Sequence, residues 1–215
     1  MKKLCLCILL GIMIMSLPGC SLSSEPTAQT SITSMTKAVR KYDDYIFVGD
    51  SRFVGMEEAL NDYVDDDVEI VAKVGQGLAW LKKTAPDLYS RTGKTIIFNL
   101  GVNDLYNASE YAEYFNNMPK DFLANNTIIF MTVNPVDEQK EEEFGYGIRN
   151  SDIEKFNDVM KEKLDKQYFH IIDTNSYIQL NNFVTTDGLH YNYKTYRMIF
   201  DRAVECCEKK DYIKR

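Results

Sequence analysis

The sequence predicts a doubly wound α/β domain built around a five-stranded parallel sheet. Five short apolar runs are continuous rather than alternating, which is typical of strands that are buried on both faces. Between these runs, apolar residues recur at helical spacing, which indicates helices that cover the sheet. With 215 residues, the chain has room for one such domain and a short appendage.

Each apolar run ends in residues that favour turns, and these residues bound the predicted strands. Gly49-Asp50 ends the first run, Gly75 the second, Gly101 the third and Asn134-Pro135 the fourth. The predicted strands span residues 45–48, 68–72 with Val74, 95–100, 127–133 and 168–172.

Helices are predicted between the strands and after the last one. Tyr196, Phe200, Ala203 and Cys207 share one face at the carboxyl end, which is the pattern of an amphipathic helix. The predicted helices span residues 53–60, 78–81, 111–122, 153–164 and 193–207. The acidic run 137–143 is interpreted as a solvated loop or a helix start, and Cys206 and Cys207 as packing residues.

Composition excludes several classes of function. The net charge is −7, so the chain carries no basic footprint for DNA or RNA, and no nucleic-acid partner is expected. Five cysteines occur, but no C-x-x-C pair that would indicate zinc or thioredoxin chemistry. We therefore expect neither a metal nor an organic cofactor.

The amino terminus has the pattern of a targeting segment. Lys2 and Lys3 precede 14 uncharged, mostly apolar residues, a length that suits a signal peptide and falls short of the roughly 20 residues needed to span a bilayer. The stretch ends in Leu17-Pro18-Gly19-Cys20, which resembles the lipobox of bacterial lipoproteins. That resemblance implies cleavage before Cys20, acylation of its thiol and an extracytoplasmic, membrane-anchored protein.

The predicted organisation is therefore a signal peptide over residues 1–19, a tether rich in Ser and Thr over 20–38, and a folded domain over 39–215. Loss of the signal peptide removes two lysines and no acids, so 23 basic and 32 acidic residues leave a net charge of −9.

Polar residues follow the predicted strands at the edge where ligands bind in such sheets. The segments are Gly49-Asp50-Ser51, Gly75-Gln76-Gly77, Gly101-Val102-Asn103-Asp104 and, after the fifth strand, Asp187-Gly188-Leu189-His190. Acyl transfer needs a nucleophile, a base, an acid that orients the base, and donors for the oxyanion. Ser51, His190 and Asp187 fit the first three roles. The side-chain amide of Asn103, with backbone N–H groups of a glycine and of Ser51, fits the fourth.

This set of segments resembles the SGNH hydrolases, also called the GDSL esterase and lipase family. The four family blocks appear in order, and the resemblance covers about residues 44–205. It implies a flavodoxin-like five-stranded sheet, a metal-free Ser-His-Asp triad and an oxyanion hole with three donors. Gly77 is the expected glycine of that hole, with Gly75 as the alternative. Arg52 stands where the family name implies Leu, which bears on substrate preference.

The remaining polar residues near this edge are given structural roles. His170 lies within the fifth apolar run and is interpreted as a packed or hydrogen-bonded core histidine, which leaves His190 as the base. Asn134, Asp173 and Asn175 are expected to shape the loops around the site.

The function expected from these residues is an esterase that removes a small acyl group, acetyl by preference, from a carbohydrate or related alcohol such as a cell-wall or environmental glycan. Acidic residues in the stretch 134–150 would repel anionic lipids and fatty-acid products. Arg52 could instead select a carboxylate on an acidic glycan, and Phe144 and Tyr146 either pack on the domain or offer a sugar platform. The alternatives are a lipase or lysophospholipase, and a catalytically silent surface lipoprotein that binds a glycan.

Overall fold

A five-stranded parallel sheet forms the centre of the computed structural model, which describes residues 44–64 and 68–213. The strand order is β2-β1-β3-β4-β5, and each neighbouring pair runs parallel. The strands are β1 (Tyr45–Gly49), β2 (Glu69–Ala72), β3 (Thr95–Asn99), β4 (Thr127–Met131) and β5 (Phe169–Ile172). The predicted fold class is confirmed. The predicted signal peptide, its Cys20 and the tether lie outside the described residues.

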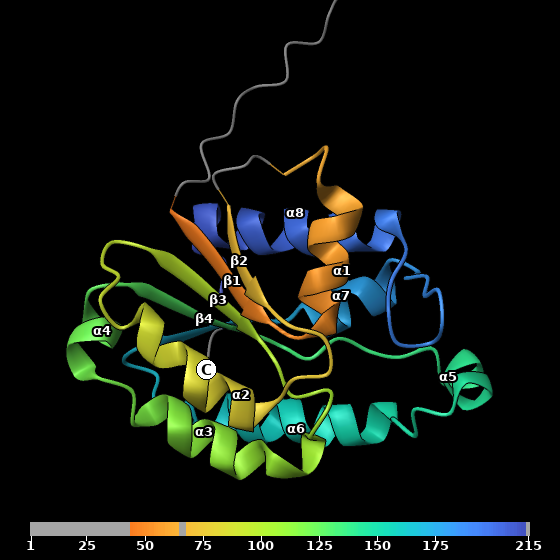
Figure 1. Ribbon diagram of the computed structural model, residues 1–215, viewed down its shortest axis with the longest axis horizontal. Helices are drawn as coiled ribbons and strands as arrows, with labels where there is room; N and C mark the ends of the chain where they lie inside the picture. The colour runs from red at the N-terminus through yellow and green to blue at the C-terminus, as the bar shows by residue number, and fades with distance from the viewer. Residues whose placement is uncertain (1–43, 65–67, 214–215) are drawn as a thin grey trace, which may run out of the picture. The chain divides into compact units, whose positions relative to one another are not determined.

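Helices cover both faces of the sheet (Figure 1). One layer contains α1 (Ser51–Leu60), α7 (Thr174–Leu180) and α8 (Tyr193–Lys209). The other contains α2 (Leu78–Thr84), η1 (Ala85–Leu88), α3 (Ala108–Asn116), α4 (Lys120–Ala124) and α6 (Asn150–Lys163). Two further short helices, η2 (Leu105–Asn107) and α5 (Glu138–Phe144), belong to the loops that follow β3 and β4.

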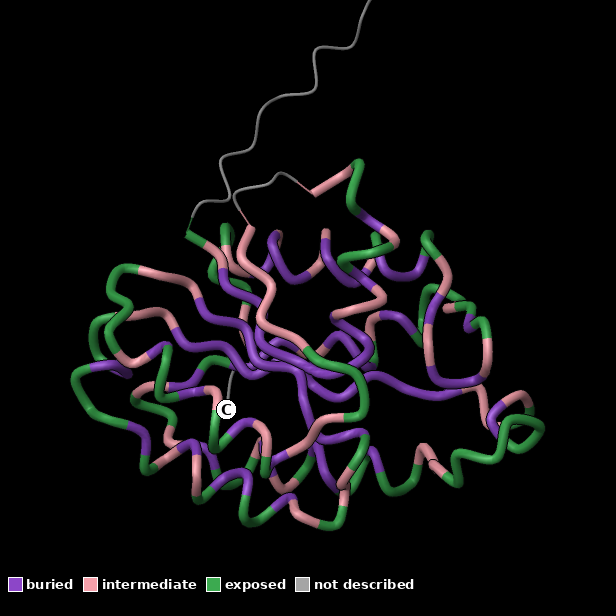
Figure 2. The backbone as a smooth tube through the Cα atoms, viewed as in Figure 1, coloured by how far each residue is buried: buried purple, intermediate pink, exposed green. Residues whose placement is uncertain are grey.

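Alternate residues of each strand enter two separate hydrophobic cores. In β1, Ile46 and Val48 pack under the α2, α3 and α6 layer, whereas Phe47 packs under α1 and α8. Figure 2 shows the central strands β1, β3 and β4 as a mostly buried band between the helix layers, whereas β2 at the edge is half-buried throughout. Burial on both faces explains why the apolar runs in the sequence are continuous rather than alternating.

Besides small shifts at the ends of elements, two predicted elements differ from the structure. Residues 111–122 form part of two helices instead of one, because Pro119 lies between α3 and α4, lacks a backbone N–H and disfavours helical geometry at Met118. The second strand ends at Ala72, and Val74 is an exposed loop residue.

His170 is not a core residue, contrary to the sequence interpretation. It lies on the edge strand β5, where its side chain is exposed and its ring stacks on Tyr212 with centroids 4.3 Å apart. Cys206 packs in the core and Cys207 is half-buried, and both thiols are free. Among the helices of residues 44–64 and 68–213, none is long and apolar enough to cross a membrane.

The strand order positions a crevice at the carboxyl ends of β1 and β3. The chain leaves β1 toward β2 on one side and later returns to build β3, β4 and β5 on the other. Connections therefore diverge between β1 and β3, and in such sheets ligands bind at this switch point. Ser51 follows β1 and Asn103 follows β3, so both lie beside the crevice.

Candidate active site

Ser51 is the first residue of α1 and directly follows the turn that ends β1. Asp50 caps this helix, because its carboxylate accepts a hydrogen bond of 3.0 Å from the backbone N–H of Arg52. Ser51 is only 6 % exposed. It lies at a helix N-terminus, where unpaired N–H groups favour negative charge.

Ser51, His190 and Asp187 form a continuous hydrogen-bonded chain. Oγ of Ser51 lies 2.9 Å from Nε2 of His190, and Nδ1 of the same ring lies 2.7 Å from Oδ2 of Asp187. A carboxylate can only accept hydrogen bonds, so Nδ1 carries the hydrogen and Nε2 has a lone pair for the Ser51 hydroxyl. This is the geometry that a serine nucleophile and its base require.

Asp187 is held in its ionised form. Burial raises the pKa of its carboxyl, but hydrogen bonds from the His190 side chain and from the backbone N–H groups of His190 and Leu189 outweigh burial and bring the pKa to about 2. Oδ1 accepts the two backbone bonds, at 2.7 Å from His190 and 3.0 Å from Leu189. Both carboxylate oxygens are thus engaged within the loop that carries the base.

A tight loop holds Asp187 and His190 in place. The backbone N–H of Thr186 donates to the carbonyl of His190 at 2.7 Å, and Thr185 pairs with Tyr191 in an antiparallel bridge. Gly188 has a φ of 91°, a conformation that favours glycine. A side chain at Gly188 would also collide with the backbone of Glu141 in α5.

Helix α5 supports this loop. The acidic run 137–143, interpreted as a solvated loop or a helix start, forms this helix, and it differs from the interpretation in that Glu141 is buried. Asp137 donates its backbone N–H to the carbonyl of Gly188 at 2.9 Å, and Nζ of Lys140 donates to the carbonyl of Thr185 at 2.9 Å. Glu141 is buried, and its Oε1 accepts a hydrogen bond of 2.6 Å from the backbone of Ile148. Local caps bound the helix, because the Asp137 side chain accepts a hydrogen bond from the backbone of Lys140 and Gly145 ends the helix with a φ of 77°.

Asn103 lies in the loop after β3, where its Nδ2 donates to the carbonyl of Gln76 at 2.8 Å. This bond joins the loops that follow β2 and β3. An amide group has two hydrogens, so one remains for a further acceptor. Asn103 is itself exposed, as a group that contacts substrate must be.

Gly77, rather than Gly75, packs against the Asn103 loop. Gly77 is the N-cap of α2, and a Cβ at this position would strike the carboxylate of Asp104. That carboxylate accepts a hydrogen bond of 2.9 Å from the backbone of Leu78. Gly75 has a φ of 69° and open space around it, which fits a role in turning the chain.

Arg52 is not available to a substrate, contrary to the sequence expectation. It is 2 % exposed, and its Nη1 donates to the carbonyl of Asn134 at 2.7 Å. Its guanidinium lies 5.4 Å from the ring centre of Tyr191. Successive side chains of a helix point about 100° apart. Because the Ser51 side chain points toward the site, that of Arg52 points into the interior of the domain.

Asp50 is buried beside this arginine. Desolvation by burial raises the pKa of the Asp50 carboxyl to about 6, although the charge of Arg52 and the hydrogen bond from its backbone act in the opposite direction. Helix α1 therefore begins at a carboxyl group that the interior makes costly to ionise.

The other predicted loop-shaping residues form hydrogen bonds behind the site, where Asn134 and Asn175 are buried and Asp173 is half-buried. Oγ1 of Thr174 donates to Oδ1 of Asn134 at 2.7 Å, and Nδ2 of Asn175 donates to the carbonyl of Val133 at 2.8 Å. Asp173 caps α7 by accepting a hydrogen bond of 3.0 Å from the backbone of Ser176.

Tyr146 contacts the triad, a role that its position in the sequence did not predict. Its hydroxyl donates to Oδ2 of Asp187 at 3.0 Å, and its ring meets the His190 ring edge-on at 86°, with centroids 6.4 Å apart. The residue is 43 % exposed rather than packed on the domain, and neighbouring Phe144 is 58 % exposed. The one sequence signal is that glycines flank Tyr146, and both have a positive φ.

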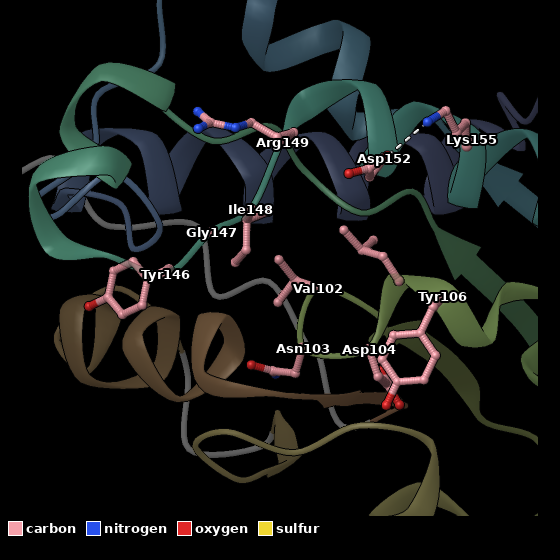
Figure 3. Close-up of a pocket in the computed structure, with 11 residues that line it drawn as sticks. Val102, Asn103, Asp104, Tyr106, Tyr146, Gly147, Ile148, Arg149, Asp152 and Lys155 are labelled. Atoms are coloured by element: carbon pink, nitrogen blue, oxygen red, sulfur yellow. Dashed lines mark hydrogen bonds and ion pairs between the residues drawn. The ribbon is translucent and has the colours of Figure 1, made fainter.

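Two open hollows border these residues. The first, of about 510 Å³, lies between the Asn103 loop and the segment that joins α5 to α6, with Tyr106 and Tyr146 on its walls (Figure 3). The second, of about 570 Å³, contains Ser51 and His190 and extends along α1 past Val54 and Ala59. Within the described part of the chain, no group of three or more His, Cys, Asp or Glu side chains could hold a metal ion.

Comparison with known proteins supports the fold assignment. No family model and no curated protein matches the chain. Among solved structures, the catalytic domain of peptidoglycan O-acetyltransferase A from Streptococcus pneumoniae is 22 % identical with a TM-score of 0.56, over 81 % of this chain and 98 % of that one. A lipase/acylhydrolase from Enterococcus faecalis is 17 % identical with a TM-score of 0.53, over 80 % and 98 %.

A member of the lipolytic G-D-S-L family from Veillonella parvula is 15 % identical, with a TM-score of 0.53 over 75 % of this chain and 96 % of that one. At identities this low, the TM-scores show a shared fold. The chain thus has the α/β fold of the SGNH hydrolases, with a Ser-His-Asp chain at the carboxyl edge of its sheet.

Proposed function

We propose that this protein is a serine esterase that hydrolyses a small acyl ester, with Ser51 as nucleophile, His190 as general base and Asp187 as the group that orients the base. The proposal rests on the continuous hydrogen bonds of the triad, from Ser51 Oγ to His190 Nε2 at 2.9 Å and from His190 Nδ1 to Asp187 at 2.7 Å. The fold shared with a lipase/acylhydrolase, a member of the lipolytic G-D-S-L family and an O-acetyltransferase domain is in agreement with this chemistry.

In the first step, Ser51 Oγ attacks the carbonyl carbon of the ester and its proton passes to Nε2 of His190. The carbonyl electrons move onto the oxygen, and the resulting oxyanion is held by Nδ2–H of Asn103 and the backbone N–H groups of Gly77 and Ser51. The bond to the alcohol then breaks, and the alcohol leaves with the proton from His190. Water repeats the sequence on the acyl-serine and releases the carboxylic acid.

The proposed substrate is a short acyl ester, acetyl by preference, on a carbohydrate or related alcohol. Both hollows are open, and neither is an enclosed apolar tunnel of the kind that a long fatty chain requires. The exposed acid Glu143 lies on α5 beside the site and disfavours anionic lipid surfaces, whereas neighbouring Glu142 is paired with Arg149.

A series of p-nitrophenyl esters from acetate to decanoate tests this preference. We expect kcat/KM to be highest for acetate or propionate and to fall with each longer chain. A maximum at eight or more carbons would contradict the proposal and favour a lipase, which is the activity named for one structural neighbour. Absence of turnover for every ester would favour the silent glycan-binding alternative.

Transfer to a sugar hydroxyl instead of water is a second candidate outcome, because another structural neighbour is an O-acetyltransferase. Product analysis with an acetyl donor and an added oligosaccharide separates the two. Free acetate as the main product supports hydrolysis, whereas acetylated oligosaccharide supports transfer.

We also propose that the protein is an extracytoplasmic lipoprotein anchored through Cys20. The proposal rests on Lys2 and Lys3, the short apolar run and Leu17-Pro18-Gly19-Cys20. Two or more acyl chains anchor a protein stably, whereas one chain is marginal. Labelling of cells with an alkyne fatty acid should mark the wild type and not Cys20→Ala. Unlabelled wild-type protein in the medium would contradict the anchor.

A further inference from the structure

We propose that the hollow between Tyr106 and Tyr146 is the binding subsite for the alcohol part of the ester, and that its ligand is a neutral glycan. This inference rests on the proposed esterase function and adds to it the location and charge of the substrate. Figure 3 shows the two tyrosines at opposite ends of the hollow, with Asn103 between them.

The first hollow lies near the catalytic residues. The leaving alcohol takes its proton from His190, so it must lie on the side of the site that this ring faces. Tyr146 forms one wall of the hollow, and its ring centroid lies 6.4 Å from that of His190. Asn103, the proposed oxyanion donor, lines the same hollow. Ser51 and His190 themselves line the second hollow, so an alcohol bound in the first hollow would reach the reacting ester past Tyr146 and Asn103.

Exposed aromatic rings stand at both ends of the first hollow. Tyr106 is 87 % exposed and Tyr146 is 43 % exposed. The exposed ring of Phe144 stacks with that of Tyr146, with centroids 6.4 Å apart and planes 7° apart, although Phe144 does not itself line the hollow. Exposed aromatic groups gathered at a hollow mark binding sites, and tyrosine combines an apolar ring face with a polar tip. Sugars present apolar C–H faces and hydroxyl edges, which match both parts of this side chain.

The second hollow lacks this feature. Its aromatic residues, Tyr191 and Tyr196, are buried and pack on each other edge-on at 82°, with centroids 5.5 Å apart. Their ring faces are therefore occupied by the protein itself. Among the residues that line the second hollow, a sugar ring would find no exposed aromatic surface.

The cationic side chains that line the first hollow are neutralised by their neighbours. Arg149 and Lys155 line the first hollow, but each is paired with an acid at 2.8 Å, Arg149 with Glu142 and Lys155 with Asp152. These pairs cancel the charge of the two cations and retain donors and acceptors for hydroxyl groups. The further acid of the lining, Asp104, accepts hydrogen bonds from the backbone of Leu78 and the hydroxyl of Tyr111. A site of this kind favours a neutral polyhydroxyl ligand over a carboxylate or an amine. Its volume of about 510 Å³ lies within the ~300–1,000 Å³ that is usual for small-molecule sites.

Calorimetric binding of sugars without ester groups tests this inference independently of catalysis. The full-length chain is titrated with tetrasaccharides of xylose, glucose and N-acetylglucosamine, and with tetragalacturonate as the anionic counterpart. We expect at least one neutral tetrasaccharide to bind, and to bind more tightly than tetragalacturonate. Tyr106→Ala should weaken that binding about tenfold, the order of one aromatic contact.

Leu180→Ala is the matched control, because Leu180 is an exposed apolar residue at the end of α7 and lies outside both hollows. It should leave the dissociation constant unchanged. Circular dichroism verifies that Tyr106→Ala is folded, as expected for so exposed a side chain. Binding of no neutral sugar, tighter binding of tetragalacturonate, or equal binding by Tyr106→Ala and wild type would each overturn the inference.

The outcomes separate this inference from the proposed function. Sugar binding that depends on Tyr106, with no turnover of any ester, would support the subsite and contradict the esterase. Ester turnover that depends on Ser51, without sugar binding, would support the esterase and contradict the subsite.

Discussion

Tyr146 and Asp187 are joined by a hydrogen bond of 3.0 Å, and the accepting atom, Oδ2, is the one that also meets Nδ1 of His190 at 2.7 Å. A residue from the segment after α5 therefore contacts the carboxylate that orients the base. Because Gly145 and Gly147 flank Tyr146 at φ values of 77° and 74°, the chain turns on both sides of the ring. The tyrosine is positioned to restrain Asp187 without touching Ser51.

Tyr146→Phe removes this hydrogen bond and keeps the ring. A hydrogen bond is worth on the order of 1 kcal/mol net, so we expect kcat for p-nitrophenyl acetate to fall about threefold to tenfold. KM should change little, because the hydroxyl acts through Asp187. Tyr193→Phe makes the same chemical change at an exposed residue of α8 and is the control. Equal kcat values for both variants would contradict a positioning role.

Asn103→Ala removes the proposed side-chain donor for the oxyanion. Loss of one such donor typically lowers kcat by about a hundredfold to a thousandfold, with KM little affected. Steady-state kinetics with p-nitrophenyl acetate measures both constants. A rise in KM alone would instead make Asn103 a ground-state binding residue.

Gly188→Ala tests whether close packing of α5 holds the catalytic loop. The added Cβ is strained by the φ of 91° and collides with the backbone of Glu141. Gly93→Ala is a matched control, because Gly93 has a φ of 70° and no atom within 4 Å of a new Cβ. Both variants bear the backbone strain, which costs about 1–3 kcal/mol, but only Gly188→Ala adds a clash.

We therefore expect Gly188→Ala to lower the thermal midpoint more than Gly93→Ala and to reduce kcat as well. Differential scanning calorimetry and ester kinetics on the same samples measure both effects. Unchanged kcat in Gly188→Ala would show that the contact with α5 is dispensable for the geometry of His190.

Asp50 gives a prediction for the pH dependence of stability. Its pKa is about 6 in the folded protein and 3.8 as the ordinary value, so the folded state binds this proton more tightly than the unfolded chain does. The resulting stabilisation is complete below about pH 4 and is lost as pH rises through about 6. A shift of this size corresponds to on the order of 3 kcal/mol.

Asp50→Asn keeps a helix cap but removes the titration. We expect the thermal midpoint of this variant, relative to wild type, to rise between about pH 4 and pH 6. Asp87→Asn changes an exposed acid and serves as the control. A difference between Asp50→Asn and wild type that is constant across this range would contradict the assigned burial of the charge.

The strands and the residues that follow them could be predicted because burial on both faces leaves a strong pattern. A continuous apolar run as short as residues 127–133, bounded by turn residues, favours a buried strand over a helix. Parallel strands end at one edge, so the sequence alone could place Ser51 and Asn103 near each other.

The errors arise where tertiary contacts decide the outcome. The acidic composition of α5 predicts exposed side chains, yet Glu141 is buried. Its carboxylate accepts a hydrogen bond from the backbone of Ile148, seven residues further along the chain, and this contact forms only when the loop folds back. Arg52 looked available because of its place next to Ser51, but its direction depends on the helical turn and on the acceptor at Asn134. The contact of Tyr146 with Asp187 spans 41 positions, and no local pattern encodes it.

The activity of Ser51→Ala against p-nitrophenyl acetate tests the central claim most directly. Ser90→Ala, which changes an exposed serine in a turn, is the control. Triad members act as a unit, so we expect Ser51→Ala to lower kcat/KM by at least about a thousandfold while its thermal midpoint remains within a few degrees of wild type. A folded Ser51→Ala protein that keeps most of the wild-type kcat/KM would contradict the assignment of Ser51 as nucleophile.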